Sequence, residues 1–116
     1  MVTVAETTEY ARRAGKLLSE NERTELIGYL ASHPEAGNVM EGTGGVRKLR
    51  WGREGRGKSG GVRVIYFYYN DQMPLYLLSI YGKNEKDNLS AAERNELAKL
   101  TSLLVKTARR AGGGNK

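Results

Sequence analysis

The chain has 116 residues, no cysteine and one histidine, and its formal net charge is +6. This length suits a single domain, and the lack of cysteine excludes disulfide frameworks and thiolate zinc sites. Any metal site would have to be built from carboxylates, so we expect none. No apolar run is long enough to cross a membrane, and residues 1–13 lack the apolar stretch of a signal peptide. We therefore expect a cytoplasmic protein with no membrane partner.

The positive charge is concentrated in one short segment. Residues 47–63 carry seven basic side chains and one acid, whereas the rest of the chain holds 12 basic and 12 acidic residues. The seven are Arg47, Lys48, Arg50, Arg53, Arg56, Lys58 and Arg63. Charge focused in this way is typical of a surface that binds a polyanion. Nucleic acid is the favoured ligand class, with an anionic membrane surface or an acidic protein as alternatives.

The N-terminal third predicts one short strand and two helices. Residues 2–4 favour an edge strand, and apolar residues at i, i+4, i+7 and i+8 predict an amphipathic helix over 7–18. Ser19 and Glu22 have the spacing of a capping box, which starts a second helix. That helix should end before Pro34, because a residue preceding proline disfavours helical geometry.

The next segment changes from a helical period to a strand period. Residues 34–45 are predicted as loop, and strands are predicted over 46–51, 62–69 and 75–81. The last two are apolar at both parities, so they should be central, with at least one face covered by helices.

A final helix follows, with a capping box formed by Ser90 and Glu93. Its predicted apolar stripe comprises Leu97, Leu100, Leu103 and Leu104. The order β-α-α-β-β-β-α predicts an α+β fold: a small, mostly antiparallel sheet with helices packed on one face. We expect one domain over 1–111 and a flexible tail over 112–116.

Residues 52–59 match the expression for a nucleotide-binding P-loop, with Gly52, Gly57, Lys58 and Ser59 in register. A P-loop requires a helix after the lysine, because the helix N-terminus binds the phosphates. Here a strand composition follows, so we expect no nucleotide cofactor. The glycines instead predict a flexible connection between two strands, with Arg53, Arg56 and Lys58 at its tip.

Several basic side chains are placed for chemistry. Lys48 and Arg50 should share one side of their strand, and Arg63 interrupts an apolar strand, where a guanidinium is costly to bury. Arg63 therefore either pairs with a carboxylate or faces a cleft and binds phosphate bidentately. Lys83 and Lys86 follow the last strand and either line the same cleft or are solvated.

If the ligand is RNA, scission by the neighbouring 2′-hydroxyl needs a base, charge stabilisation on the phosphorane and a proton for the 5′-oxygen. His33 precedes a proline at a helix end and is interpreted as a capping or surface group. Clustered lysines and arginines can replace a histidine pair, because mutual repulsion lowers a lysine pKa and arginine stabilises the transition-state charge.

Three stretches, "GTGGVRKLRW", "GKSGGVRVIYFY" and "PLYLLSIYGKNEKDNLSAAERNELAKL", resemble the HigB branch of the RelE/ParE toxins of bacterial type II toxin–antitoxin systems. The resemblance implies the α+β order above and metal-independent cleavage of mRNA in the ribosomal A site. It also implies a cognate antitoxin, usually a helix-turn-helix protein. From charge we expect that antitoxin to present an acidic covering surface.

The resemblance also implies roles for single residues. Lys48 and Arg50 match the family's basic pair on the strand before the long loop, as base or phosphate contacts. Arg63, in "GVRVIY", matches the arginine that stabilises the transition state. Arg47 joins the loop-tip residues as an expected contact to RNA or the ribosome.

The match is weaker after the last strand. Lys83 and Lys86 correspond to the family's basic cluster, but Asn84 stands where RelE has arginine. The tyrosine that stacks on a base in RelE has no counterpart near Leu89, so Tyr81 is the candidate for stacking. The general acid stays unassigned. Two alternatives remain: a ParE-like toxin acting on DNA gyrase, against which the basic set argues, and an RNA-binding module without catalysis.

Overall fold

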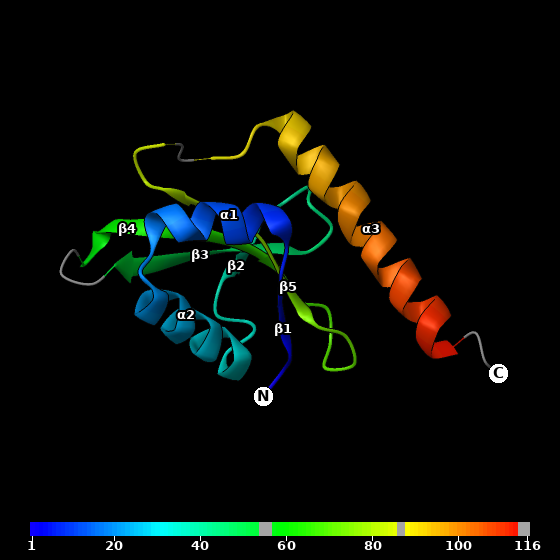
Figure 1. Ribbon diagram of the computed structural model, residues 1–116. Coiled ribbons are helices and arrows are strands. Elements are labelled where there is room, and N and C mark those ends of the chain that lie inside the picture. The colour runs from blue at the N-terminus through cyan, green and yellow to red at the C-terminus, as the bar shows by residue number, and fades with distance from the viewer. Residues whose placement is uncertain (54–56, 86–87, 114–116) are drawn as a thin grey trace.

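The computed structural model describes residues 1–53, 57–85 and 88–113, with side chains for all of these except 53, 57–60 and 111–113. Five strands and three helices follow one another along these ranges (Figure 1). They are β1 (Val4–Glu6), α1 (Thr8–Leu17), α2 (Glu20–Ser32), β2 (Asn38–Val39), β3 (Val46–Arg53), β4 (Gly57–Phe67), β5 (Leu75–Gly82) and α3 (Ala91–Gly113). The strands form one sheet in the order β1-β5-β4-β3-β2, in which only the β1–β5 pair is parallel. The predicted α+β class is confirmed.

Both predicted N-terminal helices are present with their caps. The Thr7 side chain accepts a hydrogen bond from the Tyr10 amide at the start of α1, and Ser19 and Glu22 form the capping box of α2. One face of each helix packs on the sheet, because the apolar positions recur at helical spacing. The buried cluster that they share with the sheet includes Tyr10, Ala14, Leu26, Leu30, Val62, Val64, Tyr66, Leu75 and Leu77.

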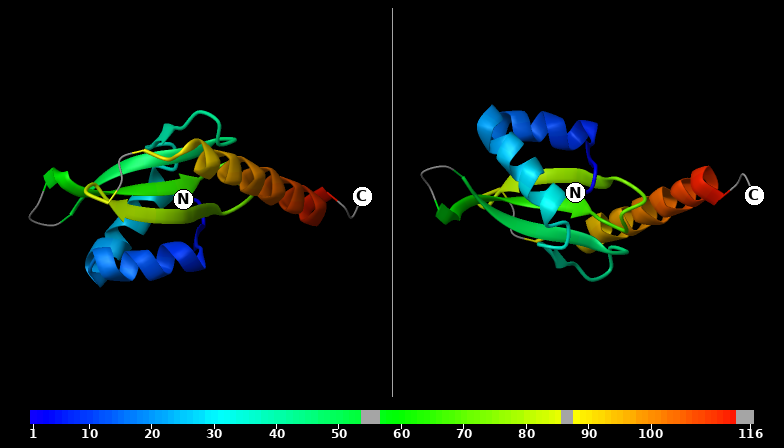
Figure 2. Two further views of the ribbon diagram at one scale, coloured as in Figure 1. Left: turned by 90° about the horizontal axis from the view of Figure 1, so that it is seen from above. Right: turned by 90° about the horizontal axis from the view of Figure 1, so that it is seen from below.

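The third helix lies across the opposite face, so the prediction that all helices pack on one face is wrong (Figure 2). Successive residues of a strand point to opposite faces, and β4 is apolar at both parities, which gives it two faces to cover. Ile65 and Phe67 belong to a second cluster, against which Leu97, Leu104, Val105 and Ala108 of α3 pack. Leu100 and Leu103 of the predicted stripe are exposed instead.

The segment predicted as loop over 34–45 contains the short strand β2, which pairs with Arg47 and Lys48. Its two residues carry too little pattern to be recognised. The turn that follows holds α3 in place: Thr101 donates a hydrogen bond to the Thr43 carbonyl at 3.2 Å. Gly44 has a φ of +75°, and a Cβ there would lie 2.3 Å from Thr101 Oγ1. Glycine is therefore required for the close approach of turn and helix.

Within the described ranges, none of the helices is both long and apolar enough to cross a membrane. α3 continues to Gly113, two residues into the segment expected as a tail.

Candidate nucleic-acid interface

Basic side chains from β3 and β4 share one face of the sheet. In the antiparallel register Arg50 lies opposite Arg63, and Arg63 lies opposite Tyr81 of β5. Lys48 is two residues from Arg50 on the same face and lies opposite Ile65. Neighbouring strands are about 5 Å apart, so these three cations converge on a small area. We call Lys48, Arg50 and Arg63 the basic cluster.

Arg63 is the most unusual member of this cluster. Its side chain is 4 % exposed, and its Nη1 atom is buried without a hydrogen-bond partner. No carboxylate pairs with it in the part of the chain that the structure describes. Directly opposite lies another arginine, and like charges at such positions are destabilising. Of the two interpretations of Arg63, pairing with a carboxylate is not observed among the described residues, and the geometry suits an anionic ligand.

Arg50 and Lys48 complete this surface at different depths. Arg50 is exposed and Lys48 is half-buried. A ligand approaching from solvent therefore meets Arg50 first, whereas Arg63 lies beneath. This difference in exposure suits a phosphodiester, because the exposed Arg50 can pair with its charge and the buried Arg63 can stabilise that charge further.

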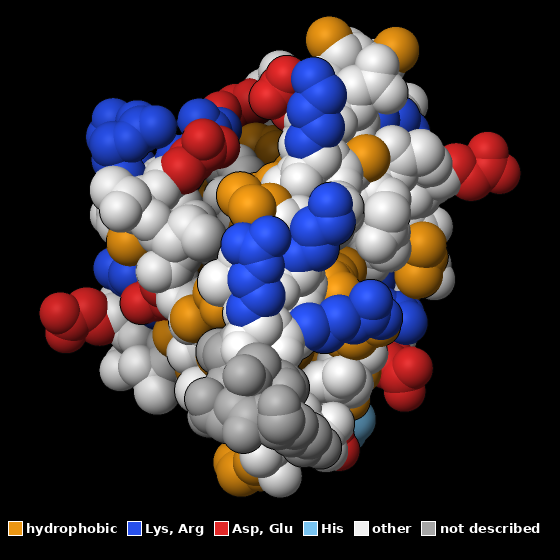
Figure 3. All heavy atoms as spheres, turned by 90° about the vertical axis from the view of Figure 1, so that its right-hand side faces the viewer, with side chains coloured by type: hydrophobic (Ala, Val, Ile, Leu, Met, Phe, Trp, Pro, Cys, Tyr) orange, Lys and Arg blue, Asp and Glu red, His pale blue; other side chains and the backbone are white. Residues whose placement is uncertain are grey.

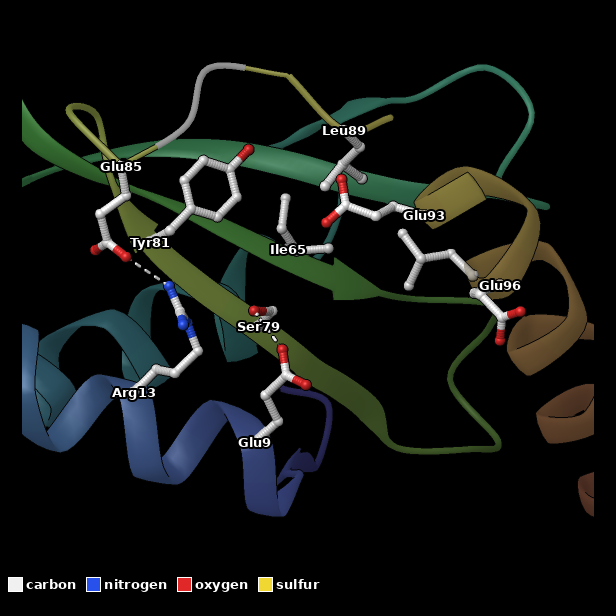
Figure 4. A pocket seen from close by; sticks show the side chains of 10 residues that line it. Glu9, Arg13, Ile65, Ser79, Tyr81, Glu85, Leu89, Glu93 and Glu96 are labelled. Atoms are coloured by element: carbon white, nitrogen blue, oxygen red, sulfur yellow. Dashed lines mark hydrogen bonds and ion pairs between the residues drawn. The ribbon is translucent and has the colours of Figure 1, made fainter. Parts of the chain in front are cut away.

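An open cleft of about 450 Å³ lies over β4 and β5, between α1 and the start of α3 (Figure 4). Its floor includes Ile65 and Tyr81, the cross-strand neighbours of Lys48 and Arg63. One wall comes from α1, and the other comes from the segment after β5 and the first turns of α3 (Figure 4). This volume falls within the range of small-molecule sites, so it can admit part of a nucleotide.

Carboxylates line much of this cleft, which the sequence did not predict. Four glutamates and one arginine contribute to it: Glu9, Glu85, Glu93, Glu96 and Arg13. They are separated by up to 87 positions along the chain, so no local pattern could have revealed them. This region of the molecule therefore has the positive charges of the basic cluster on one side and the negative charges of the cleft carboxylates on the other.

Polar contacts hold the α1 wall against β5. Because β1 covers β5 only over 75–77, the edge beyond it needs other partners. Arg13 Nε donates to the Ile80 carbonyl at 2.6 Å, and Ser79 donates to Glu9 at 2.9 Å. Glu85 accepts from Arg13 at 2.8 Å and from the Gly82 amide at 2.9 Å. These bonds fix the turn that carries Lys83.

The remaining predicted residues are distributed around this face. Lys83 and Asn84 are exposed after β5, and Tyr81 is buried at the cleft, 3 % exposed. Lys86 and Arg56 lie outside the described residues, and so do the side chains of Arg53 and Lys58. The backbone of Lys58 is part of β4, so the strand context that argued against a P-loop is confirmed.

Arg47 lies on the other face of β3, away from the basic cluster. Its Nη1 atom donates to the carbonyls of Glu35 and Gly37 at 3.1 and 2.8 Å, and Nη2 lies 3.6 Å from the Glu35 carboxylate. Tyr66, its partner across the strands, donates to Pro34 and accepts from the Gly37 amide. Arg47 thus anchors the segment after α2.

The prediction that His33 is a capping or surface group is confirmed. It is exposed at the end of α2, stacks on Tyr29 with ring centroids 4.7 Å apart and lies within hydrogen-bond distance of the Tyr29 carbonyl. Among the residues that the structure describes, no histidine and carboxylate group is arranged to hold a metal ion.

The sequence of the chain also matches a model of a known protein family. The family model described as the RelE toxin of the RelE / RelB toxin-antitoxin system matches residues 7–111. The match includes α1, α2, α3 up to residue 111, the basic cluster and the residues that line the cleft.

Proposed function

The chain belongs to the RelE toxin family, which makes it the toxin of a toxin–antitoxin system with a cognate antitoxin as partner, and from this premise we propose that it is an mRNA endonuclease acting on the ribosome. We place it in the HigB-like branch on the stretches quoted above. The observation that carries the proposal is Arg63, a buried guanidinium with an unpartnered Nη1 atom opposite a second arginine. A protein retains such a costly arrangement where it binds an anion.

In this proposal the basic cluster binds the scissile phosphate. Arg63 stabilises the charge that develops on the phosphorane, where a preorganised donor in a dry site acts most strongly. Lys48 and Arg50 contact the phosphate and assist removal of the proton from the 2′-hydroxyl. No metal ion or nucleotide cofactor is needed for this reaction.

The proposal assigns the surrounding residues to binding. Lys83 and Lys86, the second of which is outside the described residues, are proposed to supply or stabilise the proton for the 5′-oxygen. The cleft lies within a strand spacing of Arg63, and its apolar floor at Ile65 and Tyr81 would contact a nucleobase. The basic loop tip, with Arg53, Arg56 and Lys58, would contact ribosomal or messenger phosphates.

The test compares Arg63→Ala with a charge-matched control, Arg12→Ala, because Arg12 is exposed on α1. On ribosomes programmed with a defined mRNA, Arg63→Ala should lose at least a hundredfold in cleavage rate, because one oxyanion-stabilising donor is worth about 10²–10³. Arg12→Ala should remain within about threefold of the wild type once folding is verified.

Binding to the ribosome separates the alternatives. An enzyme should keep its ribosome affinity within about threefold in Arg63→Ala, whereas a pure RNA-binding module should lose affinity equally with Arg63→Ala and Arg50→Ala and show a shallower salt dependence. A toxin acting on gyrase should leave mRNA intact and trigger DNA damage. Cleavage that survives in Arg63→Ala would show that the site is assigned wrongly.

A further inference from the structure

One arginine of α1 holds both the strand β5 and the turn that follows it. Arg13 Nε donates a hydrogen bond to the Ile80 carbonyl at 2.6 Å, and Arg13 Nη2 donates to the Glu85 carboxylate at 2.8 Å (Figure 4). These acceptors lie 67 and 72 positions further along the chain. A planar guanidinium can bind both at once, because its donors point in fixed directions. A single side chain of α1 therefore connects the strand to the turn.

Glu85 extends this connection into the backbone of the turn. Its Oε1 atom accepts from the Gly82 amide at 2.9 Å, and the Glu85 amide donates to the Gly82 carbonyl at 3.0 Å. Hydrogen bonds thus run without a break from Arg13 through Glu85 to Gly82, and Lys83 lies within the turn that they close. The conformation of the turn around Lys83 therefore depends on Arg13.

This turn begins beside the basic cluster. Tyr81 lies opposite Arg63, and Gly82, the last paired residue of β5, lies opposite Val62. Neighbouring strands are about 5 Å apart, so Lys83 follows directly after the part of β5 that flanks Arg63. Any shift of the turn changes the distance between these two cations.

The far end of the same segment is held separately. Arg94 Nη1 donates to the Glu41 carbonyl at 2.7 Å, and Arg94 Nε donates to the Leu89 carbonyl at 3.4 Å. These bonds fix the start of α3 against the turn before β3. Loss of the Arg13 contacts should therefore release the turn after β5 and leave the position of α3 unchanged.

We propose that Arg13 is a positioning residue for cleavage, which acts through Glu85 by holding Lys83 at a fixed place relative to Arg63. The proposal rests on the proposed nuclease function, in which Lys83 assists the leaving 5′-oxygen. As the bond from phosphorus to that oxygen breaks, the oxygen takes up a proton and the 2′-oxygen closes the cyclic phosphate. A misplacement of about 1 Å can cost about a hundredfold in rate, so Arg13 contributes without touching the reacting atoms.

Two other roles of Arg13 lead to different results. As a structural ion pair it would affect stability alone, and as a cation in the wall of the cleft it would contact the RNA directly. Lys and Arg side chains also gather over α3, on the side of the molecule drawn in Figure 3. Removal of one positive charge is therefore not specific to this site, and each variant needs a matched control.

Arg23→Ala is the control for the ion pair. Arg23 lies 2.8 Å from Glu6, the same distance as Arg13 from Glu85, and the two arginine side chains are 27 % and 29 % exposed. Arg23 joins α2 to β1 and does not line the cleft. The two alanine variants should therefore lose similar, small amounts of stability in thermal denaturation.

Single-turnover cleavage on ribosomes programmed with a defined mRNA separates the two variants. Arg13→Ala should lower the maximal rate about tenfold or more, while the ribosome concentration at half-maximal rate stays within about threefold. Arg23→Ala should remain within about twofold of the wild type in both quantities. A wild-type maximal rate in Arg13→Ala, or an equal loss in both variants, would overturn the positioning role.

Glu85→Gln distinguishes positioning from direct contact with RNA. Glutamine keeps an acceptor for the Gly82 amide but removes the carboxylate that pairs with Arg13. Positioning predicts a loss of about tenfold in maximal rate, with no further loss when Arg13→Ala is added, because both changes break one connection. A cation that contacts RNA would be released by this change, so an unchanged or faster rate in Glu85→Gln would overturn the proposal.

Lys83→Ala tests whether Arg13 acts through the turn. In a Lys83→Ala background the further change Arg13→Ala should cost less than about twofold, because the group to be positioned is already absent. A further tenfold loss would show that Arg13 acts elsewhere, and the proposal would be wrong.

Amide hydrogen exchange gives a readout that does not depend on activity. The amides of Gly82 and Glu85 should exchange faster in Arg13→Ala than in the wild type or Arg23→Ala, whereas exchange over residues 94–104 of α3 should not change. Unchanged exchange in the turn would contradict the proposal. Wild-type cleavage in Arg13→Ala, with cleavage lost in Arg63→Ala, would overturn the positioning role alone, whereas cleavage that survives in Arg63→Ala would overturn the proposed function.

Discussion

Replacing Arg63 by methionine should stabilise the fold while it removes the proposed activity. Methionine keeps an unbranched apolar stem and removes the guanidinium, of which Nη1 is buried without a partner. Most substitutions of buried residues destabilise a protein. The opposite outcome here follows directly from the environment of this side chain.

The expected magnitude comes from two contributions. A buried charged donor without a partner costs about 1–3 kcal/mol, and a like-charged pair directly across two strands costs about 0.2–1 kcal/mol. Both disappear in Arg63→Met, while imperfect packing of the new side chain offsets part of the gain. We expect the free energy of unfolding to rise by about 1–2 kcal/mol. For a domain of this size the melting temperature should then rise by about 4–8 °C.

Urea denaturation followed by circular dichroism measures this change, with Arg50→Met as the companion variant. Arg50 is exposed, so its substitution should recover only the pair repulsion and raise the stability by less than about 1 kcal/mol. Inorganic phosphate should stabilise the wild type more than Arg63→Met, since only the wild type offers the buried donor. A methionine variant that is less stable than the wild type would refute the account of Arg63 as an unpaired buried charge.

Four further variants test the packing. The Tyr10 hydroxyl is buried without a hydrogen-bond partner, so Tyr10→Phe should be neutral or stabilise the fold by up to about 1 kcal/mol. Tyr66→Phe should instead cost about 1–3 kcal/mol, because it leaves the Pro34 carbonyl and the Gly37 amide unpaired. Urea denaturation of both variants measures this difference in stability. Burial, with the Glu6 charge, raises the pKa of Tyr10 from 10.0 to about 12. The unfolded chain therefore releases this proton first, so wild-type stability should fall by about 2–3 kcal/mol between pH 10 and pH 12, and Tyr10→Phe should lack that part of the loss. Gly44→Ala should destabilise the fold by about 2 kcal/mol or more, because the new Cβ meets Thr101 and the φ of Gly44 is positive. Gly42→Ala, with open space around the new Cβ, should cost about 1 kcal/mol. Equal losses of stability in thermal melts of the two variants would contradict the close packing of turn and helix.

Strand parity made part of the candidate site predictable. Because side chains alternate along a strand, Lys48 and Arg50 were predicted on one side of β3, and Arg63 was predicted on the same side of β4 as Ile65. The short connection between these two strands predicted that they are neighbours in the sheet. The register that sets Arg50 against Arg63 was not predictable, because an irregularity between Trp51 and Arg53 shifts the pairing near the hairpin end.

The arrangement of α3 shows where pattern reasoning fails. Four leucines at helical spacing predicted one stripe facing one core, but Leu100 and Leu103 are exposed, and Thr101, Val105 and Ala108 complete the packed side. Hydrophobic spacing identifies apolar faces but not their partners, and here one face packs on the sheet while the other stays open. For the same reason, the sequence did not predict that α3 packs on the second face of the sheet.

The contacts of Arg47 and the acidic cleft could not be predicted for a different reason. Both depend on long-range geometry: Arg47 bonds to carbonyls about ten residues away, and the cleft's carboxylates come from α1, the segment after β5 and α3. The charge concentration over 47–63 was visible from the sequence, but the separation of Arg47 from Lys48 onto opposite faces assigns different tasks to neighbouring residues.

The chemistry of the cleaved ends tests the central claim most directly. Purified protein, ribosomes carrying an end-labelled mRNA and an excess of EDTA are incubated together, with a second mRNA that has a 2′-deoxy sugar at the scissile nucleotide. Attack by the 2′-hydroxyl at the basic cluster predicts fragments ending in a 2′,3′-cyclic phosphate and a 5′-hydroxyl, and no cleavage at the deoxy position. Fragments with 5′-phosphate ends, unaffected cutting of the deoxy substrate or intact mRNA throughout would contradict the account.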